Sequence, residues 1–204
     1  MSGFFSRTAV VFGVVFVVTG AAHSQNLVAN GEFGTGISGW HLVGRGALSH
    51  SGDGAISAGA LQAEGGLAGN ATQAVAGQCI AAVSPAQSLN FQAEIRVVSG
   101  SPSYCRIALF ESEYSDCRWI GLGAEVRRTS FSGGWDSLHG GTLITSADTA
   151  SVEVRLHCTT ATGDLQALEV RFDDIVVTSA GPAVTIFADD FETGNTVKWS
   201  STVP

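Results

Sequence analysis

The sequence predicts an all-β fold, an antiparallel β-sandwich of the jelly-roll class. Apolar and polar residues alternate along several short segments, which is the pattern of strands with one buried face and one wet face. Glycine-rich turn signals separate these segments, and no stretch places apolar residues at helical spacing. With 45% apolar residues and 11 phenylalanines, the chain has enough hydrophobic surface for a folded core. Many short strands joined by such turns are typical of sandwiches and jelly rolls.

The first 24 residues have the three parts of a secretory signal peptide. Arg7 precedes an apolar run over residues 9–18, and Ala22-His23-Ser24 offers a cleavage site. The run is shorter than the roughly 20 apolar residues that a membrane-spanning helix needs. We therefore expect an exported protein, secreted to the periplasm or the extracellular space, without a membrane span. A retained N-terminal anchor is the alternative.

The jelly-roll module is expected over residues 25–179. The clearest alternation lies at 89–97, 152–158 and 168–172, where every second residue is apolar. Turns are predicted at residues 51–54, 99–100, 132–134 and 140–141, because these positions hold clusters of glycine with serine or aspartate. In chain order, the expected strands are 40–43, 55–60, 72–75, 89–97, 105–109, 152–158, 168–172 and 184–187.

The four cysteines, Cys79, Cys105, Cys117 and Cys158, all follow the leader. An even number in an exported chain predicts two disulfides, and no CxxC or Cys/His spacing points to zinc. Three pairings are open. Cys105 and Cys117 flank the turn-forming segment 113–116, so the simplest expectation is Cys105–Cys117 together with Cys79–Cys158.

The chain is acidic, with a formal net charge of −8. Arg7 is the only charged residue of the leader, so the remainder has nine basic and 18 acidic residues, a net charge of −9. This sign is wrong for the phosphate-neutralising contacts that dominate nucleic-acid binding. We expect no nucleic-acid partner and no attraction to anionic membranes.

Two short motifs resemble a known family. The string Asn-Leu-Val-Ala-Asn-Gly-Glu-Phe opens the module at residues 26–33 and is followed by a glycine-rich turn and Trp40. The last strong strand holds Phe172-Asp173-Asp174-Ile175. Both are similar to the ends of CenC-type carbohydrate-binding modules of families four and nine. The resemblance spans about residues 26–178 and implies a galactose-binding-like jelly roll with polysaccharide as partner.

Three acidic residues form a candidate calcium site. Glu32 and the pair Asp173-Asp174 would converge if the two ends of the module meet at one sheet edge, and Ca²⁺ takes carboxylate and carbonyl oxygens. In the family that the motifs resemble, these ends help to hold a structural calcium ion. Gly34 stands where that family has a glutamate, which removes one carboxylate. A solvated acid in the turn together with capped strand residues, without an ion, is the alternative.

The candidate ligand-binding residues are Trp119, Tyr114 and Arg118. Carbohydrate recognition needs aromatic rings that stack on sugars and polar neighbours for hydroxyls. Tyr114 lies on the loop between Cys105 and Cys117, and Trp119 follows that loop. Trp40 and Trp135 stand where the resembling modules keep core or edge tryptophans, so we interpret both as structural.

The leading hypothesis for function is a secreted, non-catalytic module that binds carbohydrate. A glycan-acting enzyme that uses Glu111 and Glu113 on one strand face is an alternative, because glycosidases need two carboxylates. A structural cell-envelope protein without a sugar ligand is another. No GxSxG or HExxH motif is present, so no catalytic residue is assigned. Residues 34–39 match GxGxxG in form, but a strand follows, and we interpret them as a turn.

Residues 180–204 differ in character from the module. Residues 186–200 are similar to a C-terminal segment of many exported bacterial proteins, with the shape hydrophobic-Phe-x-Asp-x-Phe-Glu before Trp-Ser. We expect a linker and a short appendage there, either a truncated repeat or a sorting or docking tag.

Overall fold

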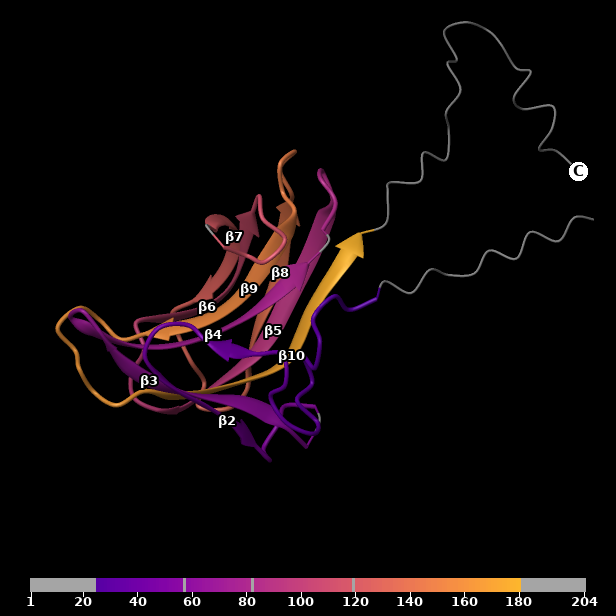
Figure 1. The fold of residues 1–204 in the computed structure, drawn as a ribbon. Coiled ribbons are helices and arrows are strands. Elements are labelled where there is room, and N and C mark those ends of the chain that lie inside the picture. The colour runs from indigo at the N-terminus through magenta and orange to yellow at the C-terminus, as the bar shows by residue number, and fades with distance from the viewer. Residues whose placement is uncertain (1–24, 57, 82, 119, 181–204) are drawn as a thin grey trace, which may run out of the picture.

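The computed structural model describes residues 25–56, 58–81, 83–118 and 120–180 (Figure 1). The predicted signal peptide, the segment from residue 181 and the expected strand at 184–187 lie outside the described residues. No helix in the described part of the chain is long and apolar enough to cross a membrane. The strands found there are β1 (His41–Leu42), β2 (Gly46–Ser51), β3 (Ala60–Ala68), β4 (Ala71–Ala81), β5 (Ser88–Ser99), β6 (Tyr104–Ser112), β7 (Gly121–Arg128), β8 (Asp136–Ile144), β9 (Ser151–Thr159) and β10 (Glu169–Ala180).

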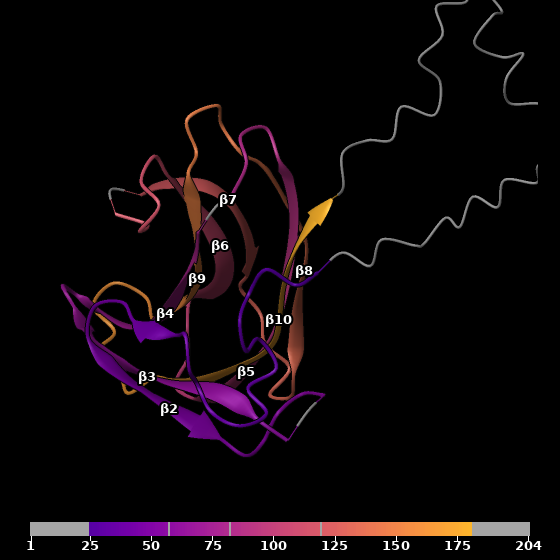
Figure 2. The same cartoon turned by 45° about the vertical axis from the view of Figure 1, so that its right-hand side comes forward.

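The strands form two antiparallel layers, and the predicted all-β sandwich is confirmed. Sheet A has the order β2-β3-β10-β5-β8, and sheet B has the order β3-β4-β9-β6-β7, with β1 paired to β4. Strand β3 belongs to both, because residues 61–64 pair with β10 and residues 66–68 pair with β4. Figure 2 shows how this shared strand lets the layers curl around one interior.

The core lies between the two layers and follows the alternation that the sequence displays. Leu89, Phe91 and Ile95 of β5 point inward from sheet A, and Val152, Val154 and Leu156 of β9 point inward from sheet B. Trp40 is buried and contacts Phe33, with ring centroids 5.6 Å apart. The structural interpretation of Trp40 is therefore confirmed, whereas Trp135 is half-buried outside the main cluster.

The opening segment of the module lies along β10, as both views show. Asn26 Nδ2 donates to the carbonyl of Ile175 (2.9 Å), and Asn26 Oδ1 accepts from the backbone N–H of Val177 (2.9 Å). The N–H of Ile175 donates to the carbonyl of Gly31 at 3.0 Å. A Cβ at Gly31 would stand 2.2 Å from the Ile175 carbonyl oxygen, so this close approach requires glycine. The two motif-bearing ends of the module are thus neighbours.

Two sequence expectations about the strands are wrong. Residues 55, 56 and 58 form bends, and a strand begins only at Ala60. The N–H groups of Ala55 and Ile56 donate to a carboxylate oxygen of Asp173 and not to a neighbouring strand. Gly140 and Gly141 lie inside β8 and not in a turn. The register of β8 against β5 shifts nearby, between the partners of Phe91 and Ala93, so the glycines accompany an irregularity in the ladder. Strands β2 and β7 are too rich in polar or small residues to show clear alternation.

Candidate functional site

The disulfide pairing differs from the expected one. Cys105 joins Cys158, and Cys79 joins Cys117. Cys105 and Cys158 point into the core from directly opposed positions of β6 and β9, with a Cα–Cα separation of 4.1 Å. Cys117 lies beyond the end of β6, where the chain folds back over β4 and reaches Cys79. The prediction from sequence proximity was wrong because neighbouring strands, not neighbouring residues, place the sulfur atoms together.

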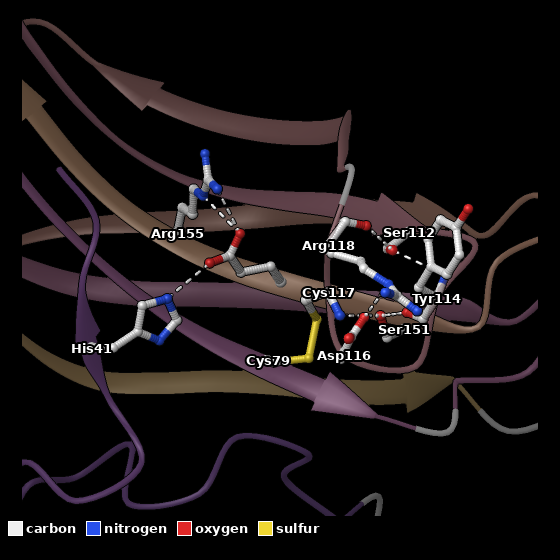
Figure 3. Close-up of a disulfide and its surroundings, with 10 residues drawn as sticks. His41, Cys79, Ser112, Tyr114, Asp116, Cys117, Arg118, Ser151 and Arg155 are labelled. Carbon is white, nitrogen blue, oxygen red and sulfur yellow. Dashed lines mark hydrogen bonds and ion pairs between the residues drawn. A yellow bond between two sulfur atoms is a disulfide. The ribbon is translucent and has the colours of Figure 1, made fainter.

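The loop over residues 113–118 is fixed on sheet B by this disulfide (Figure 3). Ser112 Oγ donates to the carbonyl of Arg118 at 2.6 Å and accepts from the N–H of Tyr114 at 3.0 Å. Ser151 Oγ, on β9, accepts from the N–H of Cys117 at 3.2 Å. Two serine hydroxyls and one disulfide therefore hold the loop in a single arrangement.

Two of the three candidate ligand-binding residues come together on this loop. The guanidinium carbon of Arg118 lies 4.4 Å from the centroid of the Tyr114 ring, and Arg118 pairs with Asp116 at 3.2 Å. Tyr114 is exposed, so the pair presents a ring and a charge to solvent. Trp119 lies outside the described residues.

A larger set of polar and aromatic side chains lies on the outer face of sheet B, beside this loop. The core-facing residues of β6 and β9 alternate with residues that point away from the interior, and the register aligns those outward residues across the sheet. The outer face is defined by Gln73 and Val75 of β4, Tyr104, Arg106 and Phe110 of β6, Glu125 and Arg127 of β7, and Glu153, Arg155 and His157 of β9.

Two pockets open on this face and share Gln73. The smaller, of about 240 Å³, is lined by Val43, Gly44, Gln73, Val75, Arg106, Arg155 and His157. The larger, of about 360 Å³, is lined by Ala68, Asn70, Ala71, Gln73, Ser103, Tyr104, Thr159, Thr160, Ala161 and Thr162. The smaller pocket holds two guanidinium groups, while the larger one offers hydroxyls, amides and one aromatic ring.

His157 connects the arginine side chains to the floor of the smaller pocket. Arg106 Nε donates to His157 Nδ1 at 3.2 Å, which assigns the imidazole proton to Nε2. Burial, followed by the charges of Arg106 and Arg155, lowers the pKa of His157 to about 4, against the opposite effect of Glu125. His157 is therefore neutral near pH 7 and orients Arg106 as a hydrogen-bond acceptor.

The guanidinium groups of Arg106 and Arg155 each pair with a carboxylate. Arg106 Nη1 pairs with Glu125, and both Nε and Nη2 of Arg155 bind one oxygen of Glu153 at 2.8 Å. The other oxygen of Glu153 bonds His41 Nε2 at 3.1 Å, so β1 is tied to this network. Figure 3 shows His41 and Arg155 on the other side of the Cys79–Cys117 disulfide from the loop. The pairs fix the arginines while neither carboxylate lines a pocket.

Aromatic rings accompany the charges on the same face. The guanidinium carbon of Arg127 lies 3.7 Å from the centroid of the Tyr104 ring, and that of Arg155 lies 4.7 Å from the centroid of the Phe110 ring. Tyr104 also meets the His157 ring edge-on, with centroids 5.5 Å apart. Such contacts fix the orientation of the rings, and Tyr104 also lines the larger pocket.

Two of the predicted calcium ligands, Asp173 and Asp174, lie on β10, and the opening segment that carries Glu32 runs beside that strand. Asp173 is buried; its Oδ2 accepts from the N–H groups of Ala55 (2.7 Å) and Ile56 (3.3 Å), and its Oδ1 has no partner within the described residues. Burial raises the pKa of Asp173 and of Asp174, and for Asp174 the neighbouring carboxylates of Glu94 and Glu32 raise it further.

The side chains described at the seam do not by themselves make a calcium site. The buried, unpartnered oxygen of Asp173 and the mutual repulsion of Asp174 and Glu32 are what a cation would relieve. Within the described residues, however, no group of three or more acidic, histidine or cysteine side chains could by itself hold a metal. Backbone carbonyls would have to complete the coordination, which Ca²⁺ accepts.

The acids of the enzyme hypothesis do not share a strand face. Glu113 lies beyond the end of β6, in the loop. Glu111 has other partners: its Oε1 accepts from the N–H of Ser146 and from Thr149 Oγ1, both at 2.6 Å. Glu111 therefore holds the segment between β8 and β9 and is not paired with Glu113 across an open cleft.

Sequence reasoning missed the outer face of sheet B, although a signal for it existed. Glu153, Arg155 and His157 are the polar half of the alternation at residues 152–158, and such residues are ordinarily taken as a wet strand face. Three ionisable residues on one strand in a chain with only 14% charged residues form an unusual concentration. Only the register could bring them beside Tyr104 and Arg106 of β6.

Comparisons with known proteins find likeness at the level of the fold. No protein-family model matches the sequence, and no curated protein matches it. Among solved structures, the chain is similar to a family 16 carbohydrate-binding module, with 18% identity, a TM-score of 0.55, and coverage of 75% of this chain and 99% of that one. It is also similar to the CBM22-2 xylan-binding domain from Paenibacillus barcinonensis Xyn10C, with 14% identity, a TM-score of 0.51, and coverage of 74% and 98%.

A third similar structure is much longer than this chain. The enzymatically active domain of tailspike protein 4 of bacteriophage CBA120 has 10% identity and a TM-score of 0.55, and the match covers 76% of this chain but 21% of that one. The described fold thus corresponds to a whole module in the first two structures and to a part of the third.

Proposed function

We propose that this protein is an exported, non-catalytic module that binds polysaccharide on the outer face of sheet B. The observation that carries the proposal is the pair of adjoining pockets on that face, which combine an aromatic ring, hydroxyls and guanidinium groups. Solved carbohydrate-binding modules share the fold, which supports the same class of ligand. The opening and closing motifs support the finer assignment to a CenC-type module.

The larger pocket has the chemistry that a sugar residue needs. Tyr104 supplies an aromatic surface, and the hydroxyls and amides of Ser103, Thr159, Asn70 and Gln73 surround it. Sugar rings carry apolar C–H faces and hydroxyl edges, so one stacking ring with nearby donors and acceptors matches both. Arg127 stacks over one face of the Tyr104 ring at 3.7 Å, which orders the ring before a ligand arrives.

The loop over residues 113–118 extends the proposed surface at the other end of β6 and β9. Tyr114 and Arg118 form an exposed stacked pair there, and Trp119 follows directly in the sequence. A chain polymer that occupies the pockets and continues along the sheet would reach this loop. We therefore keep Trp119, Tyr114 and Arg118 as proposed ligand contacts, secondary to Tyr104.

Export and calcium complete the proposal. Disulfides persist in oxidising compartments, so the two disulfides support a periplasmic or extracellular location. A structural Ca²⁺ at Glu32, Asp173 and Asp174 would join the opening segment to β10. The proposal gives that ion no part in the binding of sugar, because the seam belongs to β10 and the pockets belong to sheet B.

Affinity electrophoresis of the purified protein in gels that contain single polysaccharides tests the proposal. We expect retardation by at least one polymer of a panel that includes xylan, β-glucan, galactan and polyuronates. Tyr104→Ala should weaken that binding roughly tenfold, the effect of one aromatic stacking contact. Tyr114→Ala is the matched variant on the loop and should weaken binding less.

A reducing-sugar assay on the same polymers separates binding from catalysis. Retention without release of sugar supports the module. Release that Glu111→Gln abolishes would favour the glycan-acting enzyme. If no polymer retards the protein and none is cleaved, the proposal is wrong and a structural role in the cell envelope is favoured.

A further inference from the structure

We infer that the polysaccharide bound by this protein is acidic, with the carboxylate of a uronic-acid residue seated in the smaller pocket between Arg106 and Arg155. The inference rests on the proposed function, which places polysaccharide on the outer face of sheet B. It adds the chemical class of the sugar, which the fold and its similarity to known modules leave open.

The charge of the smaller pocket is the first argument for an acidic ligand. Among the described residues, Arg106 and Arg155 are the charged ones that line this pocket, while the whole chain has a net charge of −8. The low pKa of His157 leaves that side chain neutral above about pH 4, so the imidazole adds no charge at neutral pH. Because the paired carboxylates Glu125 and Glu153 do not line the pocket, a ligand there meets the guanidinium groups, which favour an anionic group over a neutral one.

Each of the two arginines keeps a hydrogen-bond donor for a ligand, which is the second argument. Arg106 uses Nη1 and Nε for Glu125 and His157, and Arg155 uses Nε and Nη2 for Glu153. Within the described residues, Arg106 Nη2 and Arg155 Nη1 have no hydrogen-bond partner, so each guanidinium keeps a donor nitrogen for a ligand. Planar guanidinium groups match carboxylates better than they match hydroxyls.

The chemistry of the neighbouring, larger pocket is the third argument. This pocket is lined by hydroxyls, amides and Tyr104 and contains no charged residue, so it suits the neutral part of a sugar chain. Arg127 stacks on Tyr104 and, in the described part of the chain, has no carboxylate within ion-pair distance, so a third guanidinium group lies beside the pockets. The two pockets together therefore fit a polymer in which hydroxyl-rich rings carry carboxylates.

Affinity electrophoresis with a charged polymer and its neutral derivative tests the inference. The probes are polygalacturonate, the same polymer after full methyl esterification, alginate, a sulfated galactan and neutral xylan. We expect a polyuronate to bind roughly tenfold more tightly than the methyl ester or xylan, the effect of a charge-assisted contact, and the preference to weaken as salt is added.

Two variants test whether the smaller pocket causes the preference for a polyuronate. Removal of Arg155 alone would leave the buried Glu153 without its partner, so the double change Glu153→Gln with Arg155→Gln removes both charges together, and melting temperature confirms that the variant folds. We expect this variant to lose the preference for the polyuronate. Arg96→Gln is the matched control: Arg96 pairs with Asp53 on sheet A, and its loss should leave the preference unchanged.

Each other outcome has a defined meaning. Equal binding of polygalacturonate and its methyl ester, or binding of xylan alone, would overturn the acidic ligand while the proposed function stands. Binding of the sulfated galactan without either polyuronate would overturn the carboxylate. A preference that survives in the double variant would overturn the assigned pocket. Binding of no polymer at all would overturn the proposed function together with this inference.

Discussion

His157 is the residue whose ionisation is most strongly changed by the fold. Its ring is buried among Arg106, Arg155 and Glu125 on the outer face and beside Tyr104, and its pKa is lowered from 6.5 to about 4, chiefly by burial. Below pH 6.5 the unfolded chain therefore binds a proton at this position while the folded protein does not. Stability that is present above pH 6.5 is lost as the pH falls towards 4.

We predict that His157→Gln removes part of this pH dependence. Between pH 7 and pH 5 the wild-type protein should lose about 2 kcal/mol more unfolding free energy than the variant, because only the wild type has the imidazole to protonate when unfolded. Urea denaturation at the two pH values measures the difference. Carboxylates titrate in both proteins and cancel in the comparison. Equal pH dependence of the two proteins would show that the pKa of His157 is not lowered in the folded protein.

Gly141 is a second residue whose identity the packing requires. It lies opposite Phe91 in the β5–β8 ladder, and a Cβ at this position would stand 2.3 Å from the buried Phe91 ring. We predict that Gly141→Ala destabilises the protein by about 1–3 kcal/mol through overpacking. Gly121→Ala is the control, because Gly121 is exposed on β7 with open space around it. Thermal denaturation of the two variants should separate them; similar melting temperatures would contradict the packing argument.

At the scale of elements, the disulfides join parts of the chain that lie far apart in sequence. Cys105–Cys158 links β6 to β9 inside the core, whereas Cys79–Cys117 fixes the loop over residues 113–118 on β4. The first is fully buried and the second includes the exposed Cys79. The two therefore differ in their access to solvent and in what they hold.

We predict that mild reduction opens Cys79–Cys117 before Cys105–Cys158, because a thiol reagent reaches only the exposed disulfide in the folded protein. Alkylation followed by peptide mapping should label Cys79 and Cys117 first. Mapping without reduction should yield the peptides that join these same pairs. Recovery of a Cys105–Cys117 peptide would contradict the structure and restore the pairing suggested by sequence proximity.

The strands differ in how well sequence predicts them. Strand β9 and the first part of β10 show clean alternation because one face of each packs on the core and the other is polar. Strand β8 was not predicted, because its glycines were interpreted as a turn. In the structure they lie near a shift in the register between β5 and β8. The segment 55–60 was mistaken for a strand because small apolar residues alternate there without a neighbouring strand to pair with.

At the scale of the whole molecule, the opening segment and β10 close the sandwich. Backbone hydrogen bonds join Leu27 to Val177 (2.7 Å) and Ile175 to Gly31 (3.0 Å), and Asn26 adds two side-chain bonds. Asp174 lies at this seam with a φ of 47°, in the left-handed region that few non-glycine residues adopt. Acidic side chains thus gather where the two ends of the module meet.

We predict that the melting temperature rises with added Ca²⁺ and falls with a chelator. An ion that binds only the folded protein stabilises it by about 2.7 kcal/mol at a hundredfold excess over its Kd. Asp174→Ala should remove the response, and Glu111→Gln, a carboxylate change away from the seam, should retain it. A melting temperature that does not depend on Ca²⁺ would favour the alternative in which Glu32, Asp173 and Asp174 hold no ion.

The sequence by itself determined the class of fold and the principal core residues of the strongest strands. These follow from local patterns, because burial of one strand face imposes a period of two on hydrophobicity. The disulfide partners and the outer face of sheet B were decided only by the tertiary structure. Strand order and register determine which residues of β4, β6, β7 and β9 stand side by side, and the spacing of residues along one chain does not contain that information.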